Sequence, residues 1–179
     1  MQDVFIEYMV KQQKTIKTAI LKILIAVGTI IFALAMFALV FSQVLWVFSF
    51  LAVILAVASF FGAYFLVTSL NLEFEYSITN GEMDVDKIIA QRKRQRLMSI
   101  KWRNVEGFGK YKPSEHIGKS RAQKIFACDS PKSDDLWYCI TRVPQKGQVL
   151  LVFNANEKML MAIKKYLPKP LLLAAFKKS

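Results

Sequence analysis

The feature that most constrains this chain is an apolar stretch from residue 23 to residue 72. Its 50 residues include no Asp, Glu, Lys, Arg or His. A helix needs about 20 apolar residues to cross a bilayer core about 30 Å thick, so the stretch is long enough to cross twice. A soluble amphipathic helix would show a polar face about every 3.6 residues, and none recurs here. The stretch therefore predicts a transmembrane hairpin, with helices at about 18–41 and 44–70 joined at Ser42-Gln43.

The charges beside the hairpin predict its orientation. Lys11, Lys14, Lys17 and Lys22 lie before the first helix or in its first turns, whereas Ser42-Gln43 carries no charge. Positive residues are retained on the cytoplasmic side of a membrane. We therefore expect a multi-pass protein of the plasma membrane with both termini in the cytoplasm. A cleaved signal peptide is excluded, because its apolar core is usually about 7–15 residues long.

Residues 1–17 precede the hairpin and are expected to form a cytoplasmic or interfacial segment. Val4, Phe5, Tyr8 and Met9 fall at i, i+1, i+4 and i+5, which is the apolar stripe of an amphipathic helix. Such a helix would lie along the membrane interface. The alternative is that this helix extends the first membrane span into water, and the pattern fits both.

The remaining chain, residues 71–179, is long enough for one small domain with its own core. It contains 21 Lys and Arg against 11 Asp and Glu, and so carries most of the formal net charge of +12. On a domain tethered to a membrane, this excess attracts anionic lipid headgroups. Nucleic acid is the other natural partner for such charge. The chain contains no recognised nucleic-acid-binding motif, so we do not expect that partner.

Alternating patterns predict three antiparallel strands directly after the hairpin. Residues 72–79 alternate apolar and polar side chains, and Asn80-Gly81 is a strong signal for a two-residue hairpin turn. Residues 82–89 form the expected return strand. Residues 91–96 are expected to form a charged turn, followed by a third strand with Met98, Ile100 and Trp102 on one face.

The last part of the domain is expected to contain shorter strands and one helix. Strands are predicted near residues 106–111, 124–128, 136–143 and 148–153, with residues 109–123 as an insertion. A helix is predicted at about 156–167, capped by Asn154 or Asn156 and stopped by Pro168. The apolar tail, residues 169–179, either docks on the domain, which we place at 71–168, or dips into the membrane interface.

This order of elements resembles the bacterial membrane-anchored proteins with a pleckstrin-homology-like (PH-like) domain. The resemblance covers about residues 41–167 and depends on strand segments 76–79 and 97–100 together with Asn104-Val105-Glu106-Gly107-Phe108. The chain is also similar to an uncharacterised bacterial family of the same layout. The resemblance implies a β-sandwich or barrel of six to seven antiparallel strands capped by a C-terminal helix. With the membrane hairpin, the fold class is thus an α-helical hairpin plus a mainly β domain.

The basic turn Arg92, Lys93, Arg94 and Arg96 is the sharpest candidate site. PH domains of eukaryotes bind phosphoinositide headgroups through basic residues of strand-connecting loops, so the resemblance implies a contact with anionic lipid. Each cation near the surface would contribute about 1 kcal/mol. The alternatives are a solvated turn, a further positive-inside signal, or a contact with a protein partner or nucleic acid.

Two other groups of charged residues have simpler explanations. The basic loop is expected to face the membrane or solvent rather than stack on nucleic acid, although aromatics lie among its cations. The carboxylates of the first two strands are expected to form a solvated face balanced by Lys101 and Arg103. The basic loop comprises Lys110, Tyr111, Lys112, His116, Lys119, Arg121 and Lys124, and the carboxylates are Glu73, Glu75, Glu82, Asp84 and Asp86.

The sequence gives no pattern for catalysis, a metal or a cofactor. Cys128 and Cys139 flank a turn where they can approach each other, and are expected to be reduced, buried thiols. His116 has no predicted partner that would make it a base or a ligand. We therefore expect a non-enzymatic membrane protein that presents an interaction domain to lipid, to a protein or to another copy of itself. The alternative is a small oligomeric transport or channel subunit.

Overall fold

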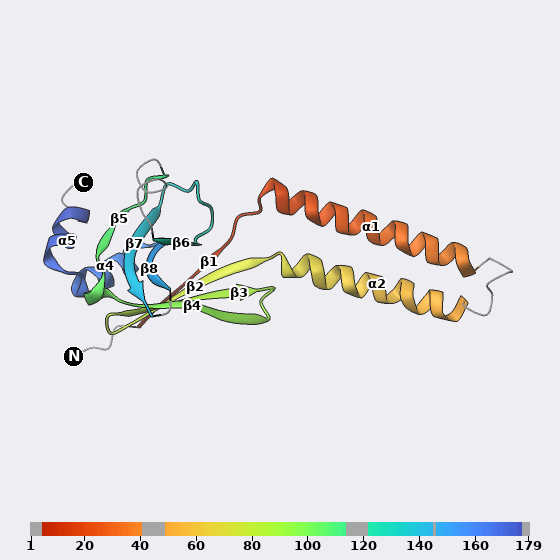
Figure 1. Cartoon of the computed structure of the whole chain (residues 1–179), viewed down its shortest axis with the longest axis horizontal. Helices are drawn as coiled ribbons and strands as arrows, with labels where there is room; N and C mark the ends of the chain where they lie inside the picture. Colours follow the sequence, from red (N-terminus) through yellow and green to blue (C-terminus); the bar gives the residue numbers. More distant parts are fainter. Residues whose placement is uncertain (1–4, 41–48, 114–121, 145, 177–179) are drawn as a thin grey trace. The chain divides into compact units, whose positions relative to one another are not determined.

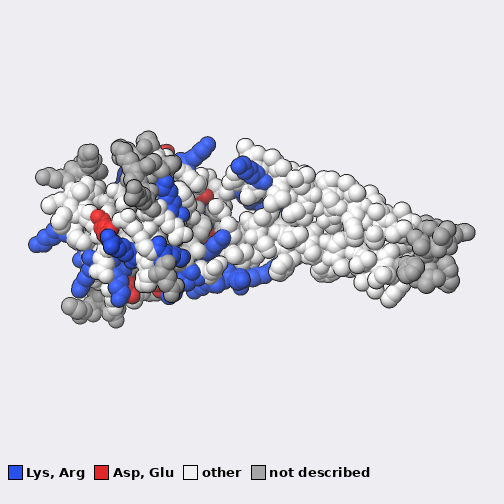
Figure 2. Space-filling view, in the orientation of Figure 1, with Lys and Arg blue, Asp and Glu red and all other residues white. Residues whose placement is uncertain are grey.

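The computed structural model describes residues 5–40, 49–113, 122–144 and 146–176 (Figure 1). The chain forms two compact units, one of residues 14–71 and one of residues 1–13 together with 72–179. The first unit contains helices α1 (Ile16–Val40) and α2 (Ser49–Ser69), each long and apolar enough to cross a membrane. In Figure 2, the charged side chains gather on the other unit and leave most of the surface of the helices white. The predicted turn at Ser42-Gln43 lies outside the described residues.

Helices α1 and α2 pack against each other as a hairpin. The Lys22 ammonium donates a hydrogen bond of 2.8 Å to the Asn71 side chain, which places the start of α1 beside the end of α2. Hydroxyl groups within the helices bond to the preceding turn, as in the 2.7 Å bond from Thr29 to the Ile25 carbonyl. Such internal bonds satisfy polar groups where water is absent.

The first sheet has the order β1-β2-β3-β4 and is antiparallel throughout. The predicted helix within residues 1–17 is wrong, because residues 5–11 form strand β1 and pair with β2. The same segment also fits the alternation of a strand, in which Ile6, Tyr8 and Val10 turn toward the core. Pairing with β2 satisfies the backbone and overrides the local helical pattern. The strands are β1 (Phe5–Lys11), β2 (Leu72–Thr79), β3 (Glu82–Ile89) and β4 (Lys93–Lys101).

The second sheet has the order β5-β7-β8-β6. Strand β6 pairs parallel with β8, so the prediction of an all-antiparallel domain is wrong for this pair. The described residues form eight strands rather than the predicted six to seven, because residues 5–11 form β1 where the sequence predicts a helix. The strands are β5 (Gly107–Lys110), β6 (Gln123–Ala127), β7 (Leu136–Val143) and β8 (Gly147–Asn154).

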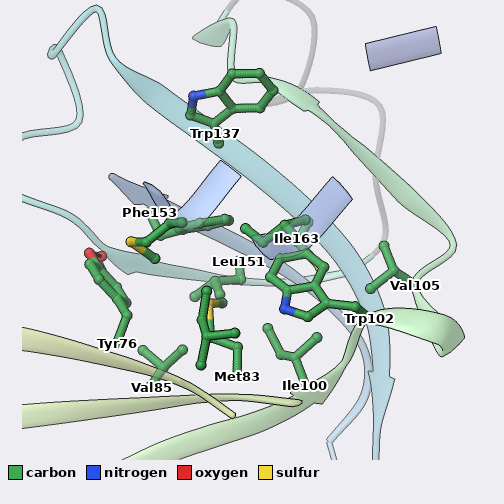
Figure 3. Close-up of a cluster of buried hydrophobic side chains, with 14 of the residues drawn as sticks. Tyr76, Met83, Val85, Ile100, Trp102, Val105, Trp137, Leu151, Phe153 and Ile163 are labelled. Atoms are coloured by element: carbon green, nitrogen blue, oxygen red, sulfur yellow. Dashed lines mark hydrogen bonds between the residues drawn. The ribbon is translucent and has the colours of Figure 1, made fainter. Parts of the chain in front are cut away.

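The core lies between the two sheets and is closed by helix α4 (Glu157–Tyr166). The Asn156 side chain accepts a 2.8 Å hydrogen bond from the Met159 amide, so the predicted cap is confirmed. The Tyr76 hydroxyl donates to the Ala127 carbonyl and so links β2 to β6, and burial raises the pKa of this phenol. Figure 3 shows the packed side chains, including Tyr76, Met83, Val85, Ile100, Trp102, Leu151, Phe153 and Ile163.

The apolar tail docks on the domain instead of leaving it. Residues 169–176 form helix α5 (Lys169–Phe176), whose apolar side chains pack against the core. The ring centres of Phe176 and Trp137 are 5.5 Å apart. The Lys164 ammonium lies 4.1 Å from the centre of the Phe176 ring. These contacts favour docking over the interfacial alternative for residues 169–176.

The Asn80-Gly81 turn between β2 and β3 has the predicted left-handed backbone, with φ of +46° and +88°. A Cβ atom added to Gly81 would also lie 2.7 Å from the Cδ1 atom of Tyr166. The turn and the last turn of α4 are therefore fitted to each other, and only glycine suits this position.

We expect Gly81→Ala to destabilise the domain more than Gly147→Ala. Gly147 also has a positive φ, +71°, but nothing lies within 4 Å of its added Cβ. As the control, Gly147→Ala should therefore lower the free energy of unfolding only by the cost of a positive φ for alanine, about 1 kcal/mol. Gly81→Ala should lower the free energy of unfolding by about 1 kcal/mol more, because the added methyl group is forced against the Tyr166 ring. Urea unfolding followed by tryptophan fluorescence measures the free energy of unfolding of both variants. Equal losses would show that the Tyr166 ring moves aside without cost.

Candidate functional site

Both connections to residues 14–71 leave the first sheet at one end, which we call the attachment end. The Gln12 amide donates a 2.9 Å hydrogen bond to the Leu72 carbonyl, so β1 and β2 remain paired up to the connections. Leu72 pairs with Ile89, and Ile89 with Lys93, which places the β3–β4 turn at the same end. The exposed cations gathered there from the domain are Lys11, Arg92 and Lys93.

The β3–β4 turn is shorter than predicted. Ala90 and Gln91 have φ of +54° and +56°, and the Arg92 amide donates to the Ile89 carbonyl at 3.0 Å. Strand β4 already begins at Lys93, so the prediction that residues 91–96 form a charged turn is wrong beyond Arg92. Arg94 and Arg96 are strand residues, and their orientation depends on the strand.

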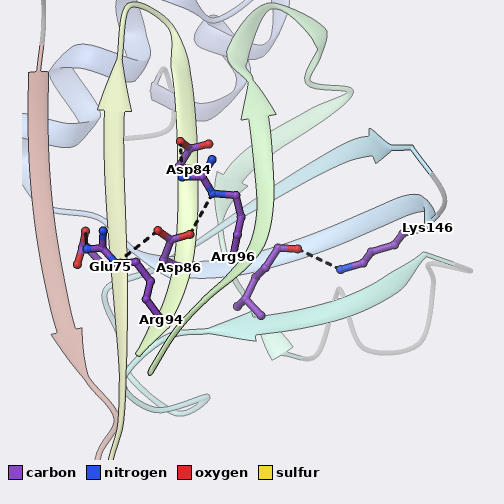
Figure 4. Close-up of polar contacts among 7 residues, drawn as sticks. Glu75, Asp84, Asp86, Arg94, Arg96 and Lys146 are labelled. Atoms are coloured by element: carbon purple, nitrogen blue, oxygen red, sulfur yellow. Dashed lines mark hydrogen bonds and ion pairs between the residues drawn. The ribbon is translucent and has the colours of Figure 1, made fainter. Parts of the chain in front are cut away.

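A β-bulge in β4 sets that orientation. Val85 pairs with Met98 but Asp86 pairs with Arg96, which leaves Leu97 as the extra residue. In a regular strand, Arg94 and Arg96 would share the core face with Met98. The extra residue reverses the alternation, so both arginines lie on the outer face of the sheet. The Lys146 ammonium donates a 3.0 Å hydrogen bond to the Leu97 carbonyl (Figure 4).

Arg94 and Arg96 form ion pairs with carboxylates of β2 and β3 (Figure 4). Arg94 bonds to Glu75 and lies 3.7 Å from Asp86, while Arg96 lies 3.2 Å from Asp86 and 3.0 Å from Asp84. The hydrogen bond to Glu75, and then the charge of Glu75, raise the pKa of Arg94. The candidate site thus divides into Arg92 and Lys93 at the turn, and two arginines paired within the sheet.

The outer face of the first sheet is only partly the solvated face that the sequence predicts. The expected pair between Glu82 and Lys101 is present at 3.1 Å. The Glu75 and Asp86 side chains, however, are only 3% and 8% exposed, and their cations are Arg94 and Arg96 rather than Arg103. The ionisable side chains of this face are Glu7, Glu73, Glu75, Glu82, Asp84 and Asp86 against Lys11, Arg94, Arg96 and Lys101.

The two cysteines are buried, as predicted, but lie in different clusters. Cys139 belongs to the main core, whereas Cys128 packs with Tyr111 and Leu136 in a second cluster. The expectation that they approach each other is therefore not met. Burial, and then the charge of Asp129, raise the pKa of Cys128 to about 12, and burial raises that of Cys139. Neither thiol is a reactive thiolate at neutral pH.

The basic loop is only partly described. His116, Lys119 and Arg121 lie outside the described residues. Tyr111 is 8% exposed and packs edge-on against Phe126, which disfavours a stacking role on nucleic acid. Among the described residues, no group of three or more His, Cys, Asp or Glu side chains is arranged to hold a metal ion.

Two four-stranded sheets around one core, closed by a C-terminal helix, define a PH-like domain, here with an inserted pair of apolar helices. The family model described as "Bacterial PH-like domain (DUF6106)" matches residues 2–173, and the chain belongs to this family. The match includes β1 and both apolar helices, so the insertion is part of the family pattern. A search of curated proteins and a search of solved structures found no match.

We expect Arg94→Gln to lower the urea midpoint of the domain, because it leaves the nearly buried Glu75 carboxylate unpaired. The double variant Arg94→Gln/Glu75→Gln should recover much of the loss, since the side chain at position 75 then carries no charge that needs a partner. Lys101→Gln, whose partner Glu82 is half exposed, is the control and should change the midpoint little. A double variant as unstable as Arg94→Gln alone would contradict this role.

Proposed function

We propose that this chain is a non-enzymatic integral membrane protein that presents its PH-like domain at the inner leaflet of the plasma membrane. The observation that supports this most is the pairing of β1 with β2. It makes both connections to the apolar helices leave the domain at one end of one sheet. Only residues 70–71 separate α2 from β2. A tether this short keeps the attachment end within a few residues of the bilayer.

We further propose that the attachment end contacts anionic lipid headgroups. Arg92 and Lys93 are exposed at the β3–β4 turn, whereas Lys11, at the end of β1, lies 3.6 Å from Glu73 of β2 and offsets that carboxylate. Arg94 and Arg96 are excluded from this role because they neutralise carboxylates of the sheet. The outer face itself carries more carboxylates than cations and would be repelled by an anionic surface.

An anchor fits the two helices better than a transport subunit. The groove between α1 and α2 has a volume of about 570 Å³, and the side chains that line it are apolar. Among the described residues, this surface offers no polar path for an ion or a solute. Residues such as Phe37, Ala52 and Phe60 instead suit packing against lipid or another helix.

The membrane orientation is tested with single cysteines and a membrane-impermeant maleimide. Lys14→Cys and Lys169→Cys should be protected in intact cells and labelled in inverted vesicles, because both flanks are expected in the cytoplasm. Ser42→Cys should show the reverse. The native chain is the control, since its two cysteines are buried. Labelling of Lys169→Cys in intact cells would contradict the proposal.

The lipid contact is tested on a chain in which a four-residue Gly-Ser linker replaces residues 14–71. A fragment beginning at Asn71 would lack β1, whereas this version keeps both paired strands. After circular dichroism has verified its fold, we expect it to sediment with anionic but not with neutral vesicles. Arg92→Gln/Lys93→Gln should weaken binding by about 2 kcal/mol, roughly 30-fold.

The matched control is Lys158→Gln/Lys165→Gln, which removes the same charge from α4. It should bind nearly as well as the parent. Equal binding to both vesicle types, or equal losses in the two double variants, would overturn the proposed contact.

A further inference from the structure

Strand β1 is an edge strand whose outer side has no strand partner among the described residues. Of the described elements, β2 is the one with which it makes more than marginal contact. Phe5 and Met9 are 64% and 49% exposed, and Ile6 and Tyr8 are half-buried. Only Glu7 and Lys11 interrupt this apolar edge. An exposed apolar edge of seven residues is a template for pairing with another strand.

The opposite edge of the same sheet is protected, which makes the contrast informative. Strand β4 carries the bulge at Leu97, and the Lys146 ammonium donates a hydrogen bond to the carbonyl of that residue. Bulges and outward charges are the usual devices that prevent pairing at a sheet edge. Strand β1, at the left of Figure 4, has neither bulge nor proline. The charges along β4 are Lys93, Arg94, Arg96 and Lys101.

The hydrogen bonds to β2 determine which residues of β1 have free backbone groups. The Gln12 amide donates to Leu72, its direct partner in the ladder. Bonded pairs alternate along an antiparallel ladder, so Ile6, Tyr8 and Val10 bond to β2 as well. The amides and carbonyls of the odd-numbered residues therefore point to the open edge. These residues are Phe5, Glu7, Met9 and Lys11, and the open edge ends there because the Gln13 amide donates to the Asp129 carbonyl at 2.8 Å.

We propose that residues 7–11 of this edge pair with the same residues of β1 in a second copy of this chain, antiparallel and centred on Met9. This register places Glu7 opposite the partner's Lys11 twice, and Met9 opposite the partner's Met9. Both are bonded positions of the open edge, as the ladder requires. Centring on Glu7 or on Lys11 would oppose like charges, and centring on Tyr8 would set Glu7 opposite a methionine. Charge complementarity thus selects one register and one occupant.

The pairing joins two four-stranded sheets into one continuous sheet of eight strands across the dimer. It buries Met9 against its counterpart, sets Tyr8 opposite the partner's Val10 and covers the open edge. The proposal does not depend on the lipid contact.

Disulfide trapping of the full chain in its native membranes tests the register. Bonded residues of an antiparallel pair have Cα atoms about 5.5 Å apart, within the range of a disulfide. Met9→Cys should therefore form a covalent dimer under mild oxidation. Phe5→Cys, on the same exposed edge, would lie about 26 Å from its counterpart in this register and should not. The native chain shows the background from its two buried cysteines.

Charge reversal in the Met9→Cys background provides the second test. Glu7→Lys and Lys11→Glu should each reduce trapping at least tenfold, and the double variant should restore it. Folding of each variant is verified by tryptophan fluorescence. Equal trapping at Met9 and Phe5, no trapping of a folded Met9→Cys chain, or trapping to a different protein would overturn the proposal. Failure of charge reversal to restore trapping would overturn the register.

Discussion

The pairing of β1 with β2 is the constraint from which the rest of the structure follows. These strands are direct neighbours, yet residues 14–71 lie between them in the sequence. Compared with a short turn, so long a connection amounts to roughly four doublings of loop length, or about 2 kcal/mol of closure entropy if it were flexible. The connection is instead a helical hairpin whose two ends are held together by the bond from Lys22 to Asn71. Folding of the hairpin therefore brings the ends of β1 and β2 together and offsets much of the entropy that is lost when the two strands pair.

The bulge at Leu97 is the second decisive feature, because it separates core from charge within one strand. On its far side Met98 and Ile100 enter the core, and on its near side Arg94 and Arg96 reach the outer face. Without it, two arginines would be directed between the sheets, where an unpaired charge is very costly. The same residue exposes a carbonyl that Lys146 binds from the β7–β8 turn. One extra residue thus positions the ion pairs and adds a contact between the two sheets.

How far the sequence predicts this structure depends on the range of the interactions involved. The apolar helices, the Asn80-Gly81 turn and the cap at Asn156 depend on neighbouring residues, and these predictions are confirmed. The strand at residues 5–11 could not be recognised, because its partner lies beyond the hairpin and its local spacing also fits a helix. The roles of Arg94 and Arg96 depend on a one-residue shift of register that alternation alone cannot reveal. The parallel pairing of β6 with β8 likewise leaves no local signal.

The insertion also explains why the open edge and the attachment end belong to the same strand. Strand β1 precedes the hairpin, and β2 already pairs with β3, so β1 can only be an edge. Its last residue, Lys11, lies a few residues from the start of α1. In the proposed membrane anchorage, the chain is confined to two dimensions, which raises the effective concentration at which two edges meet. An edge too weak to pair in solution can therefore pair in a membrane, so β1 need not be protected as strongly as β4.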